Sequence, residues 1–228
     1  MASVVDICNL ALSHLGDRAN LSSIDPPEGS AQADHCANFW PIARDEALSS
    51  YDWGFASRVA PLARLSTEDH PQWQYAYSRP ADFLVARDAM FPDGQVVTLD
   101  SNFYFEEGTL DNGTTVLFAQ FDSAALRYTR RVSTSAMYPP KLVSALSYLL
   151  ASYLAGPVVK GRAGVGMAAA MRTQWDKLAG EAMVVDANQR KDSMKFTPAA
   201  IKARGYRSDT VTIESGQYRH ELPYWAQG

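Results

Sequence analysis

The chain has little of the chemistry that holds metals or forms cross-links. It contains only two cysteines and four histidines in 228 residues. Both cysteines, Cys8 and Cys36, fall on apolar faces of predicted helices, where a free buried thiol is far more common than a disulfide. No histidine has a second ligand at one of the usual zinc spacings. The sequence therefore predicts free buried thiols, no metal site and no cofactor.

Motifs for nucleophilic catalysis and nucleotide binding are also lacking. There is no Gly-x-Ser-x-Gly elbow. The glycines at 161, 164 and 166 lack the lysine and hydroxyl residue of a phosphate-binding loop. One carboxylate pair, Glu106 and Asp111, lies on a predicted strand and its turn, and paired carboxylates can cleave a glycan. Because an acidic strand rim is the ordinary finding, the sequence predicts a protein that is not an enzyme.

Long apolar runs and an excess of positive charge are absent as well. No stretch reaches the ~18 uninterrupted apolar residues of a membrane span, and the nearest, residues 142–159, is interrupted by serines. The first fifteen residues have no basic start, so we expect no signal peptide and no membrane partner. The net charge of −4 argues against a protein whose main task is to grip duplex DNA, which requires many cations.

The charge that is present is unevenly divided. Residues 188–228 hold seven basic and four acidic side chains, a net charge of +3, so residues 1–187 carry −7. The terminal stretch has no sustained period, yet it keeps several aromatic residues between its glycines and prolines. We therefore predict that residues 189–228 form an extended arm that becomes ordered against a partner with an acidic surface. A solvated, frayed terminus is the alternative.

The first two helical patterns cover residues 3–15 and 31–51. Gly16 is well placed to end the first helix with a positive φ. Pro41 lies inside the second pattern and removes an amide donor, which predicts a kink or a break. The aromatic side chains of Asp52-Trp53-Gly54-Phe55 follow, and we expect them to pack back onto the helices.

Two more helical patterns lie nearer the C-terminus. Pro139-Pro140 opens a helix over residues 141–155, since proline is tolerated in the first turn, and Gly156-Pro157 is expected to end this helix. A connector containing three glycines then leads to a fourth helix over residues 167–188. Its predicted apolar stripe is Met171, Trp175, Leu178, Ala182 and Val185.

Between these pairs of helices the periodicity changes to two, which is typical of strands. Asn112-Gly113 is the strongest hairpin signal, and residues 100–102 are expected to form a second hairpin. The sequence therefore predicts an α+β fold, with a bundle of about four antiparallel helices, an inserted small antiparallel β-sheet and an extended C-terminal arm. The predicted bundle covers 1–61 and 136–188, the sheet 62–135 and the arm 189–228.

Arginines and aromatic residues on the strands each allow two interpretations. Arg127 and Arg131 share one face of a strand, opposite Arg130. They fit a contact with passing DNA or with an acidic subunit, and equally a solvated strand face. The aromatic residues fit a stacking platform for nucleic acid or, more commonly, one face of a core. These aromatic residues are Tyr75, Tyr77, Phe103, Phe105 and Tyr128.

Three aromatic and alanine-rich motifs follow one another along the chain. They are Trp53-Gly54-Phe55-Ala56 with Pro61-Leu62-Ala63, then Trp73-Gln74-Tyr75-Ala76-Tyr77 with Pro80-Ala81-Asp82-Phe83-Leu84, then Tyr128-Thr129 with Tyr138-Pro139 and residues 145–151. In order and spacing, the chain resembles the head-to-tail adaptor proteins of short-tailed phages, often called tail tubular protein A.

The resemblance implies a virion structural protein of the neck, made in the host cytoplasm. Such adaptors form a dodecameric ring beneath the portal, connect it to the tail nozzle and continue the DNA channel. Their helical bundle makes the ring contacts, and a C-terminal segment, here residues 189–228, embraces the portal. Arginine and aromatic residues dominate interface energetics, which selects the portal-binding candidates Arg204, Tyr206, Arg207, Tyr218 and Trp225.

Two alternatives remain open. One is a peptidoglycan-degrading tail component that uses Glu106 and Asp111, because some adaptors of short-tailed phages have been discussed as cell-wall hydrolases. The other is a neck or tail-completion protein of a longer-tailed phage, with a different tail-side partner. The expected partners are thus the portal, the tail nozzle, further copies of the chain and, in transit, genomic DNA, which an acidic body would let slide without sticking.

Overall fold

The computed structural model describes residues 2–18, 20–65, 72–90, 105–110, 113–120 and 122–189. Within them the chain has an α+β fold with four α-helices and two small antiparallel sheets, and all strands lie between the second and third helices in the sequence. This confirms the predicted class. The predicted arm from residue 190 onward and the predicted hairpin at residues 100–102 lie outside the described residues.

The helices begin where the sequence places good caps. Ser3 and Asp6 exchange side-chain and backbone hydrogen bonds in a capping box, and the Ser30 hydroxyl accepts from the Ala33 N–H at 3.2 Å.

The second helix continues through Pro41, so a break there is not observed. Pro41 is exposed, and water can satisfy the carbonyl that lost its donor. The helices are α1 (Val4–His14), α2 (Ala31–Ser49), η1 (Ser135–Met137), α3 (Pro140–Val159) and α4 (Gly161–Gln189).

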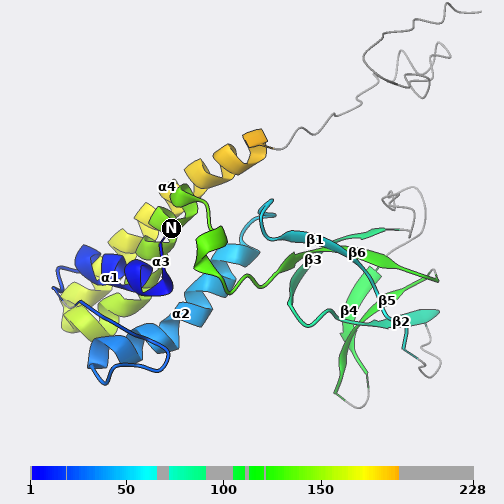
Figure 1. Ribbon diagram of the computed structural model, residues 1–228, viewed down its shortest axis with the longest axis horizontal. Coiled ribbons are helices and arrows are strands. Elements are labelled where there is room, and N and C mark those ends of the chain that lie inside the picture. Colours follow the sequence, from blue (N-terminus) through cyan, green and yellow to red (C-terminus); the bar gives the residue numbers. More distant parts are fainter. Residues whose placement is uncertain are drawn as a thin grey trace, which may run out of the picture. The chain divides into compact units, whose positions relative to one another are not determined.

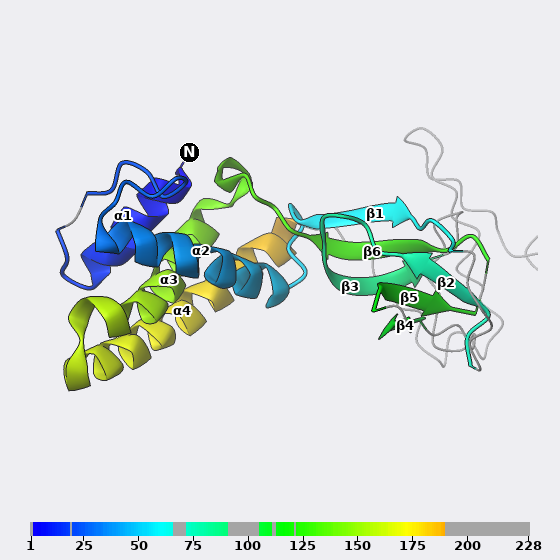
Figure 2. The same ribbon diagram turned by 90° about the horizontal axis from the view of Figure 1, so that it is seen from below.

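Helices α3 and α4 lie side by side, joined by the single residue Lys160 (Figures 1 and 2). The prediction that Gly156-Pro157 ends the third helix is wrong, as is the prediction of a glycine connector, because both stretches are helical. The glycines instead permit a close turn. Gly161 has a φ of +62°, and a Cβ at Gly164 would lie only 2.9 Å from the Ala155 carbonyl oxygen.

Helix α3 is the centre of the helical part, with contacts to α1, α2 and α4. By length and composition alone it could also cross a membrane, and half of its most apolar window is buried here against its neighbours. As predicted, Trp53 and Phe55 pack on this core; Trp53 is fully buried and donates its Nε1–H to the Ala47 carbonyl at 2.8 Å. Cys8 and Cys36 are buried and free, also as predicted.

Helix α4 packs on the core through most of the predicted stripe. Trp175 and Ala182 are buried, Met171 and Leu178 pack against the same core, and only Val185, 40% exposed, departs from the prediction. Ala179 and Asp186 are buried in addition. The observed rotation places one carboxylate, Asp186, inside the buried stripe.

Two three-stranded antiparallel sheets are present where the sequence predicted one (Figure 1). Their orders are β1-β6-β3 and β2-β5-β4, and buried side chains from both, such as Leu117 and Tyr128, form one cluster. After β1 the chain passes to the second sheet, where the Leu65 N–H donates to the Ala76 carbonyl at 2.8 Å. The strands are β1 (Ser57–Pro61), β2 (Tyr75–Ser78), β3 (Phe83–Met90), β4 (Phe105–Thr109), β5 (Thr115–Ala119) and β6 (Ala125–Arg130).

The strand aromatics are core residues. Tyr77 and Tyr128 are at most 1% exposed, and Tyr75 and Phe105 pack against the same cluster. The core interpretation is thus confirmed for these four, while Phe103 lies outside the described residues.

Two features of the strands differ from the predicted boundaries. Strand β1, predicted as part of the helical residues 1–61, pairs with β6 along its whole length. It is a short edge strand ending in proline, and such strands show little alternation.

The hairpin at Asn112-Gly113 joins β4 and β5 as predicted, and Gly113 has a φ of +81°. Its loop is longer than two residues, since the Leu110 N–H donates to the Thr114 carbonyl at 2.9 Å.

We expect Leu149→Ala to lower the free energy of unfolding by about 2–5 kcal/mol, because Leu149 is fully buried in α3 and its truncation leaves a cavity. Chemical denaturation followed by circular dichroism measures the loss. Val165→Ala is the control on the neighbouring helix: Val165 is 72% exposed, and the change should stay within about 0.5 kcal/mol. Equal losses in the two variants would contradict the assigned core.

A second prediction concerns pH. The His14 ring stacks on Tyr148 with centroids 3.9 Å apart, and its Nε2 lies 3.1 Å from the Ser147 hydroxyl. Burial lowers the pKa of His14 below its usual 6.5, so the unfolded chain binds the proton more readily. The contribution of neutral His14 to stability is therefore complete above the unfolded pKa and is lost as pH falls through the folded one.

We accordingly expect the free energy of unfolding to fall between about pH 7.5 and pH 5 in the wild-type chain, and to fall less in His14→Gln. Urea denaturation at several pH values measures the two slopes. His35→Gln serves as the control, because His35 lies in neither contact. A His14→Gln chain with the wild-type slope would show that His14 does not contribute.

Candidate functional site

The described residues bring several charged side chains together between α2 and the first sheet. Arg127 of β6 lies between two carboxylates: its Nη1 is 2.9 Å from Asp52, in the turn after α2, and its Nη2 is 2.5 Å from Asp88 of β3. Burial alone would lower the pKa of Arg127, but the two carboxylates outweigh it and raise that pKa. The charge of Arg127 is therefore balanced within the chain.

A second arginine, Arg87, reaches α2 from β3. Its Nη2 donates to the Ser49 carbonyl at 3.2 Å and to the Tyr51 carbonyl at 2.8 Å, and its Nε donates to the Thr129 hydroxyl at 2.9 Å. The last carbonyls of a helix lack intrahelical donors and carry partial negative charge. Helix α2 has no basic residue in its last turn, so Arg87 supplies the positive charge from the sheet.

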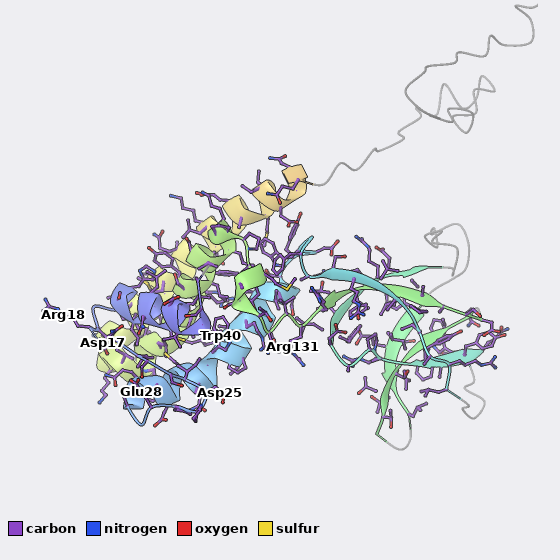
Figure 3. All side chains as sticks on the ribbon, viewed as in Figure 1. Asp17, Arg18, Asp25, Glu28, Trp40 and Arg131 are labelled. Carbon is purple, nitrogen blue, oxygen red and sulfur yellow. The ribbon has the colours of Figure 1, made fainter. Side chains whose placement is uncertain are left out.

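A third arginine follows β6. The Arg131 Nε lies 2.9 Å from the Asp45 carboxylate of α2, which also pairs with Arg44 at 2.8 Å. Figure 3 labels Arg131 at the strand end that leads toward the helices. Three arginines from β3, β6 and the residue after β6 thus bind α2 and the turn that follows it. We call this set the junction; its residues are Asp45, Asp52, Arg87, Asp88, Arg127 and Arg131.

The turn between α2 and β1 is also bound by α4. Both carboxylate oxygens of Asp186 lie 3.1 Å from the backbone nitrogen of Gly54, and Asp186 is only 7% exposed. Asp186 stands three residues before the last residue of α4. The turn therefore contacts the end of α4 through Gly54 and the first sheet through Tyr51 and Asp52.

The predicted strand arginines find their partners inside the chain. The expected acidic contacts of Arg127 and Arg131 are Asp52, Asp88 and Asp45 of the same molecule. Arg130 instead approaches the Met137 sulfur, at 3.7 Å. Two of the three predicted strand arginines, Arg127 and Arg131, are thus paired with carboxylates of the same chain. This leaves less free positive charge for DNA than the sequence suggested.

The predicted carboxylate pair is only partly described. Glu106 is exposed on β4 and accepts a hydrogen bond from the Trp73 indole at 3.1 Å, while Asp111 lies outside the described residues. A glycan-cleaving acid is ordinarily held in an apolar pocket that raises its pKa, and Glu106 is on an open surface. Among the described residues there is no group of three or more His, Cys, Asp or Glu side chains that could hold a metal.

One open hollow, of about 380 Å³, lies beside β1 and the β2–β3 connection. Its polar groups bind one another: Asp82 accepts from the Tyr128 hydroxyl at 2.7 Å and from Arg58 at 3.1 Å. Burial and the Asp82 carboxylate raise the pKa of Tyr128 to about 12. The Arg79 guanidinium stacks on the Phe83 ring at 4.1 Å. With these groups mutually engaged, the hollow offers no converging acid, base or nucleophile.

Two surfaces of the helical part differ in chemistry. Helix α4 exposes Val165 by 72%, Val184 by 60% and Val185 by 40%. On the other surface, α1 and α2 expose Leu10 by 40% and Ile42 by 51%. The connection between α1 and α2 adds charged side chains, which Figure 3 labels. These are Asp17, Arg18, Asp25 and Glu28.

The portal-binding candidates Arg204, Tyr206, Arg207, Tyr218 and Trp225 lie outside the described residues. Sequence reasoning missed the junction carboxylates, Arg87 and Asp186. Only Asp186 left a local signal, because it continues the spacing of Trp175, Ala179 and Ala182. No protein-family model matches the chain, and no curated protein matches it.

We expect Arg87→Met to lower the free energy of unfolding by about 1–3 kcal/mol, because it removes the charged donor from the last carbonyl of α2, at Ser49, and from the Tyr51 carbonyl that follows the helix. Arg64→Met is the control: its side chain is 55% exposed, and its ion pair with Asp122 spans 3.5 Å. That exposed pair should contribute less than about 1 kcal/mol. Denaturation curves compare the variants, and an Arg87→Met chain as stable as wild type would contradict the role of Arg87 at α2.

Proposed function

We propose that the chain is a virion structural protein, the head-to-tail adaptor of a short-tailed phage, which forms a ring between portal and tail nozzle. The observation that carries the proposal is the surface of α4. This 29-residue helix packs mainly on α3 and exposes three valines elsewhere. Exposed apolar side chains near both ends of the helix, Val165 close to its start and Val184 and Val185 close to its end, favour a protein partner, and identical neighbours in a ring would cover them on every subunit.

A ring of identical subunits needs two different complementary faces on each subunit. In our proposal, α4 of one copy docks on α1 and α2 of the next. The valines of α4 would meet Leu10 and Ile42, which are also exposed. Arg162, exposed at the start of α4, would face the acidic α1–α2 connection. The helices would then act as the antiparallel bundle that makes the ring contacts.

In this proposal, the segment after α4 binds the portal protein. Residues 188–228 carry a net charge of +3, and the rest of the chain carries −7. The basic segment therefore favours an acidic partner surface, whereas the acidic remainder does not attract DNA. It follows directly on the exposed α4. Within it, Arg204, Tyr206, Arg207, Tyr218 and Trp225 are the proposed contacts. Genomic DNA would pass through the ring without sequence-specific binding.

The alternatives differ in how the described residues support them. Glycan cleavage by Glu106 and Asp111 gains nothing from Glu106, which lies on an open strand surface. A neck protein of a longer-tailed phage would use the same two helical faces and would differ only in its tail-side partner. We therefore retain the adaptor as the proposal.

The test is assembly with the portal protein of the phage that encodes the chain. We expect dodecameric rings on the portal by electron microscopy, and a monomer when the purified chain is alone. Val165→Glu should prevent ring formation, because it places a charge in the proposed apolar contact, while the circular dichroism melt stays unchanged at this exposed site. Val59→Glu is the control, since Val59 is 54% exposed on β1 and outside the proposed contact.

Deletion of residues 190–228 separates the two contacts. It should abolish portal binding and leave the fold of the remaining chain intact. Portal binding that survives this deletion, or rings that tolerate Val165→Glu as well as Val59→Glu, would contradict the proposal.

A further inference from the structure

We propose that Asp186 is a latch, which couples the last turn of α4 to the turn that binds the helices to the first sheet. We call residues 50–56 the junction turn. When the end of α4 unwinds, Asp186 releases Gly54, and the junction turn loosens together with the strands that it contacts. The inference concerns the chain itself and does not depend on the adaptor function.

Helix α4 contacts the junction turn through Asp186. Both Asp186 oxygens lie 3.1 Å from the Gly54 nitrogen, in a site that leaves Asp186 only 7% exposed. Two other amides are used within the turn: the Trp53 N–H donates to Tyr51, and the Ala56 N–H donates to Trp53. A carboxylate that accepts from a backbone N–H makes a stronger bond than a neutral acceptor. Asp186 therefore restrains the Gly54 amide, which the turn directs at α4.

The junction turn contacts the first sheet through Tyr51 and Asp52. The Tyr51 carbonyl accepts from Arg87 of β3, and the Asp52 carboxylate pairs with Arg127 of β6. Tyr51 and Asp52 stand three and two positions before Gly54. Because the turn is short, a displacement of Gly54 moves both acceptors. The contacts then form a continuous path from α4 through the turn to two neighbouring strands.

Asp186 lies three residues before the last residue of α4. Met183 packs against the helical core, and of the residues after it in α4 only Asp186 is buried, so Asp186 is the last buried side chain before the helix ends. The last four carbonyls of a helix have no intrahelical donors, and helix ends fray for this reason. Any partner that binds and extends the segment from residue 190 would unwind this turn first. Asp186 thus lies at the turn of α4 through which such unwinding would affect the junction turn.

A merely structural Asp186 would stabilise the chain without transmitting anything from the helix end. The two roles are separated by a change that frays the end of α4 and leaves Asp186 and Gly54 in place. Ala187→Gly is such a change, since Ala187 is exposed and glycine weakens helices. Ala170→Gly is its matched control, because Ala170 is also exposed on α4 and lies far from the helix end.

The measurement is hydrogen exchange by mass spectrometry on the full chain. Ala187→Gly should speed exchange of the junction turn and of the strand ends at Arg87 and Arg127, by up to about fivefold. Ala170→Gly should leave those peptides at the wild-type rate. Asp186→Asn should speed exchange of the junction turn by about tenfold, because the charged acceptor is lost. Asp176→Asn, at an exposed acidic position of the same helix, controls for charge.

The double variant, Asp186→Asn with Ala187→Gly, completes the test. If the latch is the route, Ala187→Gly adds no further exchange in the junction turn once Asp186 is replaced. Equal effects of Ala187→Gly and Ala170→Gly on the turn would overturn the proposal, as would full additivity in the double variant. Should Asp186→Asn fail to fold, the two alanine variants still decide, because neither touches the latch contact.

Discussion

The end of α2 imposes the constraint on which the arrangement of helices and strands depends. Its last carbonyls need donors, and the helix has no basic residue in its last turn. Arg87, from β3, the third element after α2, donates to the carbonyl of Ser49, the last helical residue, and to the Tyr51 carbonyl just after the helix, and the register shift between Ala86 and Asp88 in β3 accompanies its position. Asp52 and Asp45 then bind Arg127 and Arg131. The helical part is therefore completed by residues of the sheets.

The features that the sequence predicted are those encoded over short distances. Trp53 and Phe55 follow directly on α2, and two large aromatic side chains beside an apolar helix face have few places to go except its core. Tyr75 and Tyr77 stand two residues apart, the period of one strand face; Tyr77 belongs to the buried cluster that also contains Tyr128, and Tyr75 packs against it. Gly113 suited a hairpin because it tolerates a positive φ. Each of these inferences needed only neighbouring residues.

The features that the sequence did not predict depend on contacts between distant segments. Gly161 and Gly164 resemble a flexible connector in the sequence. The fold gives each glycine its own reason: Gly161 adopts a positive φ, and Gly164 lies too close to the Ala155 carbonyl for a side chain. The predicted stripe of α4 is correct up to Ala182, but its continuation to Val185 is not, because Asp186 rather than Val185 is buried near the helix end. Arg87 and Tyr51 are far apart in sequence, so no local pattern announced their contact. The candidate latch at Asp186 was missed for the same reason.

The buried and half-buried polar groups of this chain share a common use. Asp186 binds a backbone amide, Arg87 binds helix carbonyls, and Asp82 binds Tyr128 and Arg58. Each is occupied by another part of the fold, whereas reactive groups of an active site must remain available to a substrate. The described residues also expose a few large apolar side chains, among them Val165 and Val184 of α4 and Ile42 of α2. In the adaptor proposal these side chains, and not the internally bound polar groups, would make the contacts with neighbouring subunits.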